Sequence, residues 1–349
     1  ISACLVGSEM CIRDRGSIFI DASGDGHIAY DAGAEYRMGR ESMDEYNESI
    51  APAKSDTYTM GPTVYLEWRD VGQPVPFKAP VWAKKLSNAD LLPMNTSIEY
   101  AYAEGRFHDA SRFRIRNRGF WWIEYGGIRD TISDGEENRD ELLKLAFGLW
   151  EKMKNHGEGA ENLELTYVSP IPGKRESRRF LGDYVLNQND LEAATLFADR
   201  IAYGGRPIDL HPPGGIYAGY APCEFRHLKS LFSIPFRCLY SKNIENLILA
   251  GRNISVTHVA LGSTRLQAQC ALIGEAAGVA AYLCKKYDTN PRGIYEKYIT
   301  ELQQLLLKQD CYIIKLKNQD PEDLARYAKV RASSTRSLEV TDKDSYDLS

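Results

Sequence analysis

The sequence lacks several features that would assign it to a common class at once. Its seven cysteines form no CxxC pair, the spacing that zinc and iron–sulfur sites use. No apolar run reaches the roughly 18 to 20 residues that cross a bilayer, because polar residues interrupt the best stretch, 266–283. The formal charge of -5, with scattered positive side chains, offers no general attraction to nucleic acid or anionic lipid. These absences argue against a metal site, a membrane span and a nucleic-acid partner, and they favour buried free thiols.

The beginning of the sequence also lacks the periodicity of a folded element. Residues 4–15 (CLVGSEMCIRDR) carry charges where a signal peptide has its apolar core. We therefore expect residues 1–15 to be a non-native leader. On that interpretation the native N-terminus and any export signal are not visible, so the localisation is unknown.

A short strand followed by a glycine-rich turn comes next. Residues 17–22 (SIFIDA) predict the strand, and SGDG at 23–26 predicts a turn that leads into a helix of small residues. Gly24 would let the backbone approach a ligand, and Asp25 could accept hydrogen bonds from hydroxyl groups. An ordinary tight turn with solvated aspartates is the alternative. A calcium loop is not supported, because Ala32 stands where the EF-hand pattern needs Glu.

A second strand–turn–helix pattern lies more than 200 residues later. Residues 246–250 (NLILA) predict a buried strand that ends at Gly251. We expect Gly262 and Ser263 to open one long helix that continues to about Tyr287, with free N–H groups facing an anion or a flavin edge. Close packing of a glycine-rich helix on a sheet explains the same residues without a ligand. We expect both strands to belong to one sheet.

The region between the two patterns has a different character. It is rich in aromatic residues and proline-marked loops, and it contains an amphipathic helix at about 135–154. The predicted fold class is α/β: a partial Rossmann-like domain formed by residues 16–40 and 242–290, with a large inserted α+β substrate domain at 41–241. Residues 291–349 are expected to form a C-terminal helix and a truncated or disordered tail.

Three arginines stand at helical spacing inside the region between the patterns. On a helical backbone Arg175, Arg178 and Arg179 would project three guanidinium groups to one side. Such a cluster needs an anion, for which a substrate carboxylate would serve. The alternative is a structural network of ion pairs, with Glu176, Asp183 and Asp190 as the partners.

Imidazole and aromatic groups supply further candidates. His258 and His211 could move a proton at neutral pH, although each could equally be a loop residue that makes hydrogen bonds. The aromatic cluster at 120–125 could stack on a sugar ring, which keeps a noncatalytic carbohydrate- or ligand-binding module as an alternative function, or it could lie in the core. Glu124 beside these rings is a possible proton carrier. A metal-dependent hydrolase using Asp21, Asp25 and His27 would need ligands that no spacing supplies.

Two segments together resemble a known family. IDASGDGHIAYDAGA at 20–34 and NLILAGRNISVTHVALGSTRLQAQCALIGEAAGVAA at 246–281 are similar to the FAD-dependent oxidoreductases related to the flavin subunit of heterodisulfide reductase. GKRESRRFLGDY at 173–184 resembles the same family, which favours a place near the active site for its arginines. The resemblance implies a glutathione-reductase-like FAD domain and transfer of a hydride from an organic substrate to the flavin, with an unidentified electron acceptor. The implied FAD contacts are at Ala22, Gly24, Asp25, Gly251, Arg252, Gly262 and Ser263.

The sequence departs from that family in one respect. Its members begin with a GxGxxG unit that holds the pyrophosphate of FAD on a helix N-terminus, and this sequence contains no such unit. We therefore expect an N-terminally truncated fragment that binds FAD weakly or not at all and that could be inactive. Some relatives carry a 4Fe-4S cluster, but no cysteine motif here supports one.

Overall fold

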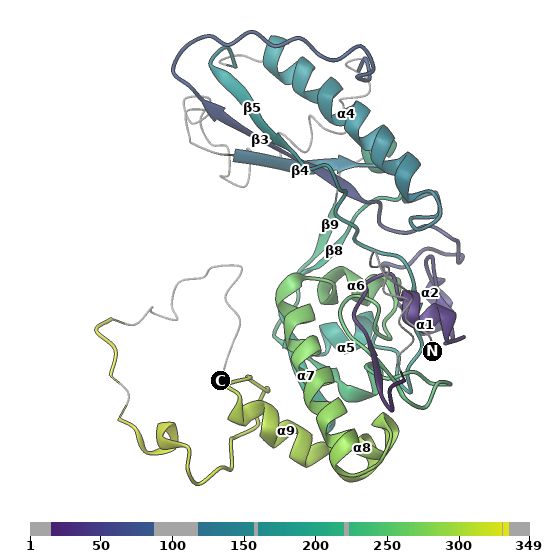
Figure 1. Ribbon diagram of the computed structural model, residues 1–349, viewed down its shortest axis with the longest axis vertical. Coiled ribbons are helices and arrows are strands. Elements are labelled where there is room, and N and C mark those ends of the chain that lie inside the picture. The colour runs from purple at the N-terminus through teal and green to yellow at the C-terminus, as the bar shows by residue number, and fades with distance from the viewer. Residues whose placement is uncertain (1–14, 87–117, 157–159, 220–222, 330, 335–349) are drawn as a thin grey trace. The chain divides into compact units, whose positions relative to one another are not determined.

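The computed structural model describes residues 15–86, 118–156, 160–219, 223–329 and 331–334 (Figure 1). The chain divides into two compact units, and each is described by itself. Unit 1 comprises Ile1–Ser55, Arg178–Ile208 and Arg226–Ser349, and unit 2 comprises Asp56–Ser177 and Asp209–Phe225. The division differs from the boundaries that the sequence suggested, because 178–208 and 226–241 pack with the two chain ends.

Unit 2 contains a three-stranded antiparallel sheet covered by one long helix (Figure 1). The strand order is β4-β3-β5. The strands are β3 (Thr63–Asp70), β4 (Arg118–Glu124) and β5 (Leu163–Val168), and the helix is α4 (Gly135–His156). The helix confirms the prediction for 135–154. The short 3-10 turn η2 (Gly215–Tyr217) packs on β4.

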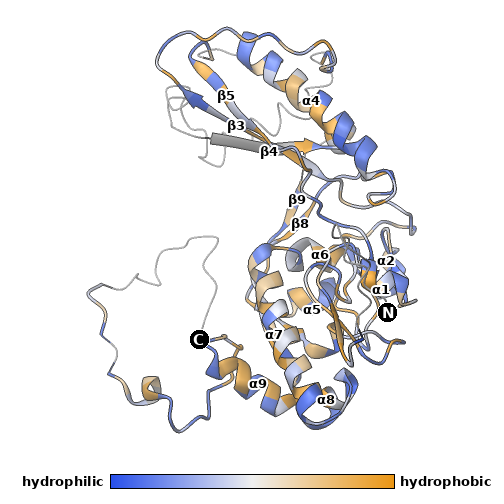
Figure 2. Cartoon of the chain, viewed as in Figure 1, coloured by the Kyte–Doolittle hydropathy of each residue, from blue (hydrophilic) through white to orange (hydrophobic). Residues whose placement is uncertain are grey.

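The alternation of side chains along β3 explains how unit 2 forms its core. Val64, Leu66 and Trp68 are buried while their neighbours are more exposed, as a strand with one covered face requires. They belong to one apolar cluster with the inner face of α4, where Trp150 lies 5.7 Å from the Trp68 ring. Figure 2 shows the alternating apolar and polar colours along α4 that such a one-sided helix carries. Each fully buried side chain of this kind contributes roughly 1.5 to 3 kcal/mol relative to its exposed state.

Unit 1 brings together the two strands predicted at 17–22 and 246–250. β1 (Phe19–Asp21) and β11 (Leu247–Leu249) pair in parallel, with Phe19 opposite Leu247 and Asp21 opposite Leu249. This confirms both strands and their place in one sheet. All of β11 is buried, which a short run of Leu and Ile between helices requires.

The remaining elements of unit 1 are short strands and helices around that pair. Two antiparallel pairs, β2 with β6 and β7 with β10, accompany it, and β8 pairs with β9 where the chain passes between the units. The helix α7 packs on β1, β7 and β11 and on α8 and α9. The strands are β2 (Tyr36–Arg37), β6 (Arg179–Phe180), β7 (Arg200–Gly204), β8 (Ile208–Leu210), β9 (Glu224–Arg226) and β10 (Phe232–Pro235). The helices are α1 (His27–Asp31), α2 (Met43–Tyr46), α5 (Gln188–Glu192), α6 (His258–Thr264), α7 (Gln267–Lys286), α8 (Pro291–Lys297), α9 (Ile299–Lys308) and the 3-10 turns η3 (Phe236–Cys238) and η4 (Leu324–Tyr327).

The long helix expected from Gly262 onward is in fact two helices. α6 begins after Thr257, whose hydroxyl accepts a hydrogen bond from the Ala260 amide, so Gly262 and Ser263 lie inside the helix and are buried. A residue in extended conformation, Leu266, then separates α6 from α7. The expectation that Gly262 and Ser263 offer free N–H groups at a helix start is therefore wrong.

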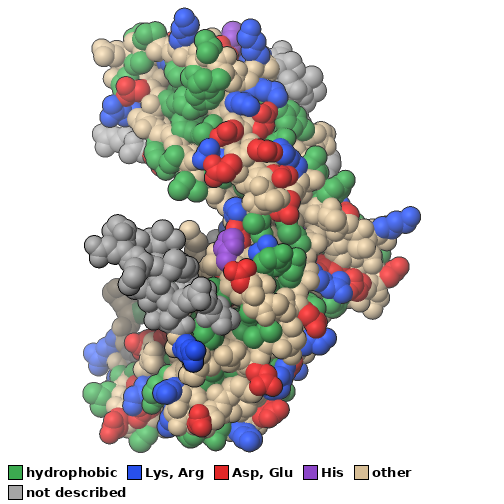
Figure 3. Space-filling view, turned by 45° about the vertical axis from the view of Figure 1, so that its right-hand side comes forward, with side chains coloured by type: hydrophobic (Ala, Val, Ile, Leu, Met, Phe, Trp, Pro, Cys, Tyr) green, Lys and Arg blue, Asp and Glu red, His purple; other side chains and the backbone are tan. Residues whose placement is uncertain are grey.

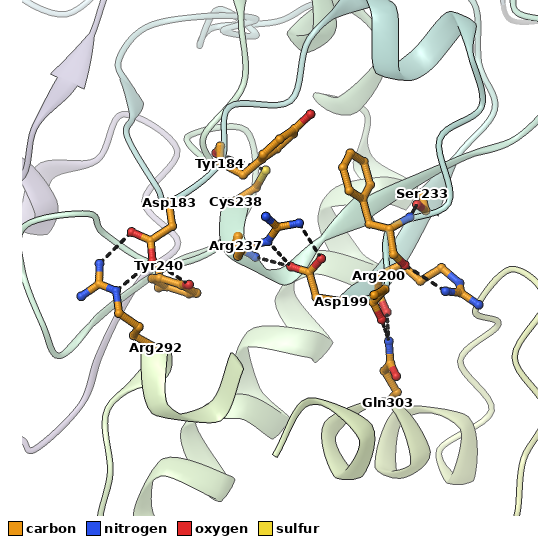
Figure 4. A network of polar contacts seen from close by, with 12 residues as sticks. Asp183, Tyr184, Asp199, Arg200, Ser233, Arg237, Cys238, Tyr240, Arg292 and Gln303 are labelled. Atoms are coloured by element: carbon orange, nitrogen blue, oxygen red, sulfur yellow. Dashed lines mark hydrogen bonds and ion pairs between the residues drawn. The ribbon is translucent and has the colours of Figure 1, made fainter. Parts of the chain in front are cut away.

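A polar network ties three segments of unit 1 together (Figure 4). The buried carboxylate of Asp199 accepts two hydrogen bonds from the Arg237 guanidinium, at 2.9 and 3.0 Å. Asp183 accepts two from Arg292 on α8, at 2.8 and 2.7 Å, and a third from the Tyr240 hydroxyl. Paired two-point contacts of this kind fix direction as well as distance, so α8 is held against the segments around β6 and η3.

On the face shown in Figure 3, Lys and Arg side chains alternate with Asp and Glu instead of forming one patch. Within the described ranges, no helix has the length and apolar character that a bilayer crossing requires.

Candidate functional site

The glycine turns after β1 and β11 lie next to each other in unit 1. The Ala250 amide donates to the Asp21 carbonyl at 2.9 Å, and the Arg252 guanidinium pairs with the Asp25 carboxylate at 2.6 Å. Both side chains of this pair are mostly buried. The structure therefore joins the two turns that the sequence placed in one site, through a contact between residues 227 positions apart.

The first turn owes its shape to Asp21. This fully buried carboxylate accepts from the amide and hydroxyl of Ser23 on one oxygen and from the Ala29 amide on the other. Gly24 and Gly26 follow with φ angles of 79° and 70°, which disfavour any residue with a Cβ atom. The aspartates of this turn are thus engaged within the protein, while Ala22, Ser23 and His27 are exposed.

The second turn leaves space for a ligand. Gly251 has a φ of 94°, and a Cβ atom built there would meet nothing within 4 Å. Beside it, the Oδ1 atom of the fully buried Asn253 has no hydrogen-bond partner in the described part of the chain. Its Nδ2 donates to the Asp21 carbonyl at 3.3 Å. Open backbone at a carboxyl strand end and a buried acceptor fit a polar cofactor such as FAD at this position.

Arg178 lies beside the first turn. Its guanidinium stacks 3.7 Å from the centre of the Tyr30 ring and 5.5 Å from that of Tyr36, and it donates to the Asp25 carbonyl at 3.4 Å. Stacking on a phenol ring favours a cation and fixes its direction. Among the three predicted arginines, Arg178 is the one that the structure places next to the glycine turns.

The three arginines do not form one cluster. The backbone from Gly173 to Arg178 is not helical and Arg179 belongs to β6, so the helical spacing does not apply. Arg175 points into unit 2 and Arg179 into the interior of unit 1. The expected partners are also engaged differently: Glu176 accepts from the Met60 amide, Asp183 pairs with Arg292, and Asp190 pairs with Tyr184.

The N-terminus of α6 is occupied by the protein's own carboxylate. Glu41 accepts from the His258 amide at 2.9 Å through one oxygen and from the Arg179 guanidinium at 2.6 Å through the other. Arg179, Glu41 and His258 are all buried. An anionic group at a helix N-terminus is favourable, and here Glu41 supplies it, so the position is not open to an external anion. Ser263, further along α6, donates its hydroxyl to the Arg206 carbonyl at 2.7 Å.

His211 and Arg175 meet in unit 2 around Glu124. The Glu124 carboxylate lies 2.6 Å from Arg175 Nη2 and 2.8 Å from His211 Nδ1, and the other imidazole nitrogen of His211 lies 3.3 Å from Asp209. All four side chains are buried. Both ring nitrogens of His211 therefore lie near carboxylates within the fold, although Nδ1 makes no hydrogen bond of good geometry in the described part of the chain.

Other predicted features contribute less to a site. For Phe120, Trp121 and Trp122 the structure describes the backbone only, while the side chain of Ile123 is buried in the core cluster. Within the described ranges no group of three His, Cys, Asp or Glu residues could hold a metal ion. The cysteines in those ranges are free thiols, at positions 223, 238, 270, 284 and 311.

Fold and site together define a mixed α/β protein whose parallel strands end in adjacent glycine turns. Comparison with known families then gives the identity at family level. The family model described as FAD dependent oxidoreductase matches residues 8–306, most of the chain. The chain belongs to this family. No curated protein and no solved structure matches it.

Several residues of the site carry no signal in the sequence. Glu41 and Glu48 stand in a segment without a recognisable catalytic motif, and Asn253 lies in the segment 246–281 without having been singled out there. Each is fully or almost fully buried. Glu41 contacts His258, 217 positions away. Only the three-dimensional structure brings such partners together, so a single sequence could not have identified them.

Proposed function

We propose that this chain carries part of the FAD site and of the substrate site of an oxidoreductase that accepts a hydride from an organic substrate on its flavin. Family membership supports the cofactor and the reaction class. The observation that carries the proposal is the Asp25–Arg252 pair, which locks the two glycine turns side by side at the carboxyl ends of two parallel strands. Ligands of open α/β sheets bind at this edge.

The backbone of both turns would hold the cofactor in this proposal. Ala22, Gly24 and Asp25 would contribute from the first turn, and Gly251 and Arg252 from the second. FAD, when bound, supplies the hydride acceptor, and the protein supplies position and charge. Gly262 and Ser263 are buried within α6, so they would act by shaping the wall of the site rather than through free amides.

In this proposal, a few side chains supply the positive charge near the cofactor and the group that exchanges a proton with the substrate. Arg178 would place a fixed positive charge beside the first turn, held by Tyr30 and the Asp25 carbonyl. His258, at the start of α6, would take up or release the proton that accompanies oxidation of a hydroxyl or amine group. Arg175 and His211 would hold the substrate-domain segments around Glu124 in place.

Flavin content tests the proposal. The chain is expressed with any coding sequence that precedes it in its gene, purified, and examined for the visible absorption of bound flavin. Denaturation and chromatography then identify the released cofactor. We expect FAD, and a folded protein that neither retains nor takes up FAD would overturn the proposal.

Two arginine variants sharpen this test. Arg252→Met should weaken FAD binding roughly tenfold or more, which corresponds to about 1.4 kcal/mol. The matched control is Arg69→Met, which removes the arginine of an exposed ion pair with Glu164 in unit 2. Equal FAD affinities in the two variants would show that the Asp25–Arg252 pair does not contribute to cofactor binding. His258→Gln and Arg178→Ala are made in the same protein, and flavin reduction is measured with a substrate found in a screen. A rate equal to that of wild type would show that the replaced residue has no role in the reaction.

A further inference from the structure

A second carboxyl group lies at the N-terminus of α6, and the proposed function does not use it. Glu48 follows α2 and has no exposed surface. One of its oxygens, Oε1, accepts two hydrogen bonds: from the Gln188 amide at 2.7 Å and from the Thr257 hydroxyl at 2.6 Å. The other oxygen, Oε2, is buried and has no hydrogen-bond partner in the described part of the chain. The two oxygens of Glu48 are therefore in unequal environments.

The Thr257 hydroxyl fixes the direction of this contact. Thr257 caps α6, and its oxygen accepts from the Ala260 amide at 3.1 Å. A hydroxyl group has one hydrogen, so Thr257 gives it to Glu48 while its oxygen receives the amide. With Oε1 accepting from these two donors, Oε2 is the oxygen that is left to carry a proton.

The Arg179 guanidinium pairs with one of the two buried carboxyl groups at the helix start. Glu41 and Glu48 are both buried, and Arg179 donates to Glu41. Gln188 and Thr257 are neutral. An ionised carboxylate without a cation in the interior costs several kcal/mol, and the group normally takes up a proton instead. Glu41 has both the guanidinium and the helix amide, so Glu48 is the group left to carry the proton.

We propose that Glu48 is held as a neutral carboxylic acid in the folded chain, against the cap of α6. Burial raises the pKa of Glu48 and Glu41 adds to this, whereas Thr257, Gln188 and the positive form of His258 act in the opposite direction. Glu48 is a positioning residue in this scheme, because it holds the Thr257 cap of α6, directly before His258. Its catalytic importance rests on the proposed role of His258, but its protonation state does not.

Infrared spectroscopy tests the protonation state without any cofactor or substrate. The chain is labelled with glutamate carrying ¹³C at the side-chain carboxyl, and wild-type and Glu48→Gln spectra are subtracted at neutral pH. We expect the difference to contain the C=O band of a protonated carboxyl group, shifted by the label. Absence of that band in a folded variant would overturn the proposal. If Glu48→Gln does not fold, carbon NMR of the labelled wild type serves instead, and a full set of glutamates ionised at neutral pH would be the refuting result.

Stability measurements give an independent check on the sign. The folded chain holds the Glu48 proton to higher pH than the unfolded chain, so its stability falls as pH rises from the ordinary glutamate value of about 4.3. Glu48→Gln cannot lose a proton, and its free energy of unfolding relative to wild type should rise with pH over that window. Glu301→Gln is the matched control: hydrogen bonds from Lys286, 2.7 Å away, and Tyr287 lower the pKa of Glu301, so its difference should run the other way. Parallel slopes in both variants would refute the assignment.

Discussion

Replacing Arg179 with methionine should destabilise unit 1 by leaving a buried carboxylate without its cation. Arg179 is 1% exposed, and its guanidinium pairs with Glu41 at 2.6 Å and donates to the Val256 carbonyl at 2.9 Å. Methionine has a similar length and keeps most of the packing, so the main loss is electrostatic. Removing one partner of a buried ion pair typically costs about 3 to 5 kcal/mol.

A double variant separates the stranded charge from the lost contacts. Arg179→Met combined with Glu41→Gln removes both charges, while the Gln oxygen can still accept from the His258 amide. We expect the double variant to recover at least half of the stability that the single variant loses, because replacing a whole buried pair is often close to neutral. Simple loss of contacts would instead make the double variant the less stable of the two.

The two units allow the measurement to be localised. All five tryptophans, at 68, 82, 121, 122 and 150, belong to unit 2 by sequence, so their fluorescence reports on unit 2 during urea unfolding. Far-ultraviolet circular dichroism also follows the helices α6 to α9 of unit 1. The loss should appear in the dichroism transition. A single variant within about 1 kcal/mol of wild type, or a double variant no more stable than the single one, would refute the reasoning.

Two further substitutions test local features of unit 1. Gly26→Ala should cost clearly more stability in thermal unfolding than Gly33→Ala. Both glycines have positive φ angles, 70° and 78°, but a Cβ atom at Gly26 would overlap the Phe180 ring, whereas at Gly33 it meets nothing within 4 Å. Equal losses would contradict this. The Arg292 guanidinium lowers the pKa of Asp183, so wild type should lose this increment of stability as pH falls below the ordinary aspartate value of about 3.9. Asp183→Asn lacks the increment, and its deficit in urea unfolding should shrink as the pH falls; a constant deficit would rule out an electrostatic origin.

Local patterns predicted the elements whose signal lies within a few residues. The apolar runs 17–22 and 246–250 became β1 and β11, and the amphipathic stretch at 135–154 became α4. Their periodicity reflects burial of one face or of the whole segment, which neighbouring residues alone can show. The sequence analysis placed both strands in one sheet, and the structure adds that they pair directly with each other.

The errors came from contacts that sequence spacing does not contain. Arg175, Arg178 and Arg179 stand at helical spacing, yet their backbone is not helical because each guanidinium has a different distant partner. Tertiary contacts override weak local preference in such segments. The helix start at Thr257 was missed for a related reason, since Glu41 and Glu48, which complete its cap, precede it by more than 200 positions.

The parallel pairing of β1 with β11 has a consequence for synthesis of the protein. Phe19 of β1 pairs with Leu247 of β11, so the two strands cannot pair until the 228 positions between them have been synthesised. At roughly 5 to 20 residues per second, a ribosome needs on the order of ten to forty-five seconds to make that length. Unit 2 lies entirely within the interval, so it can fold while β1 still lacks the strand it pairs with. The early strand is then exposed to other chains and to chaperones during translation, and slow translation of the middle region would lengthen that exposure.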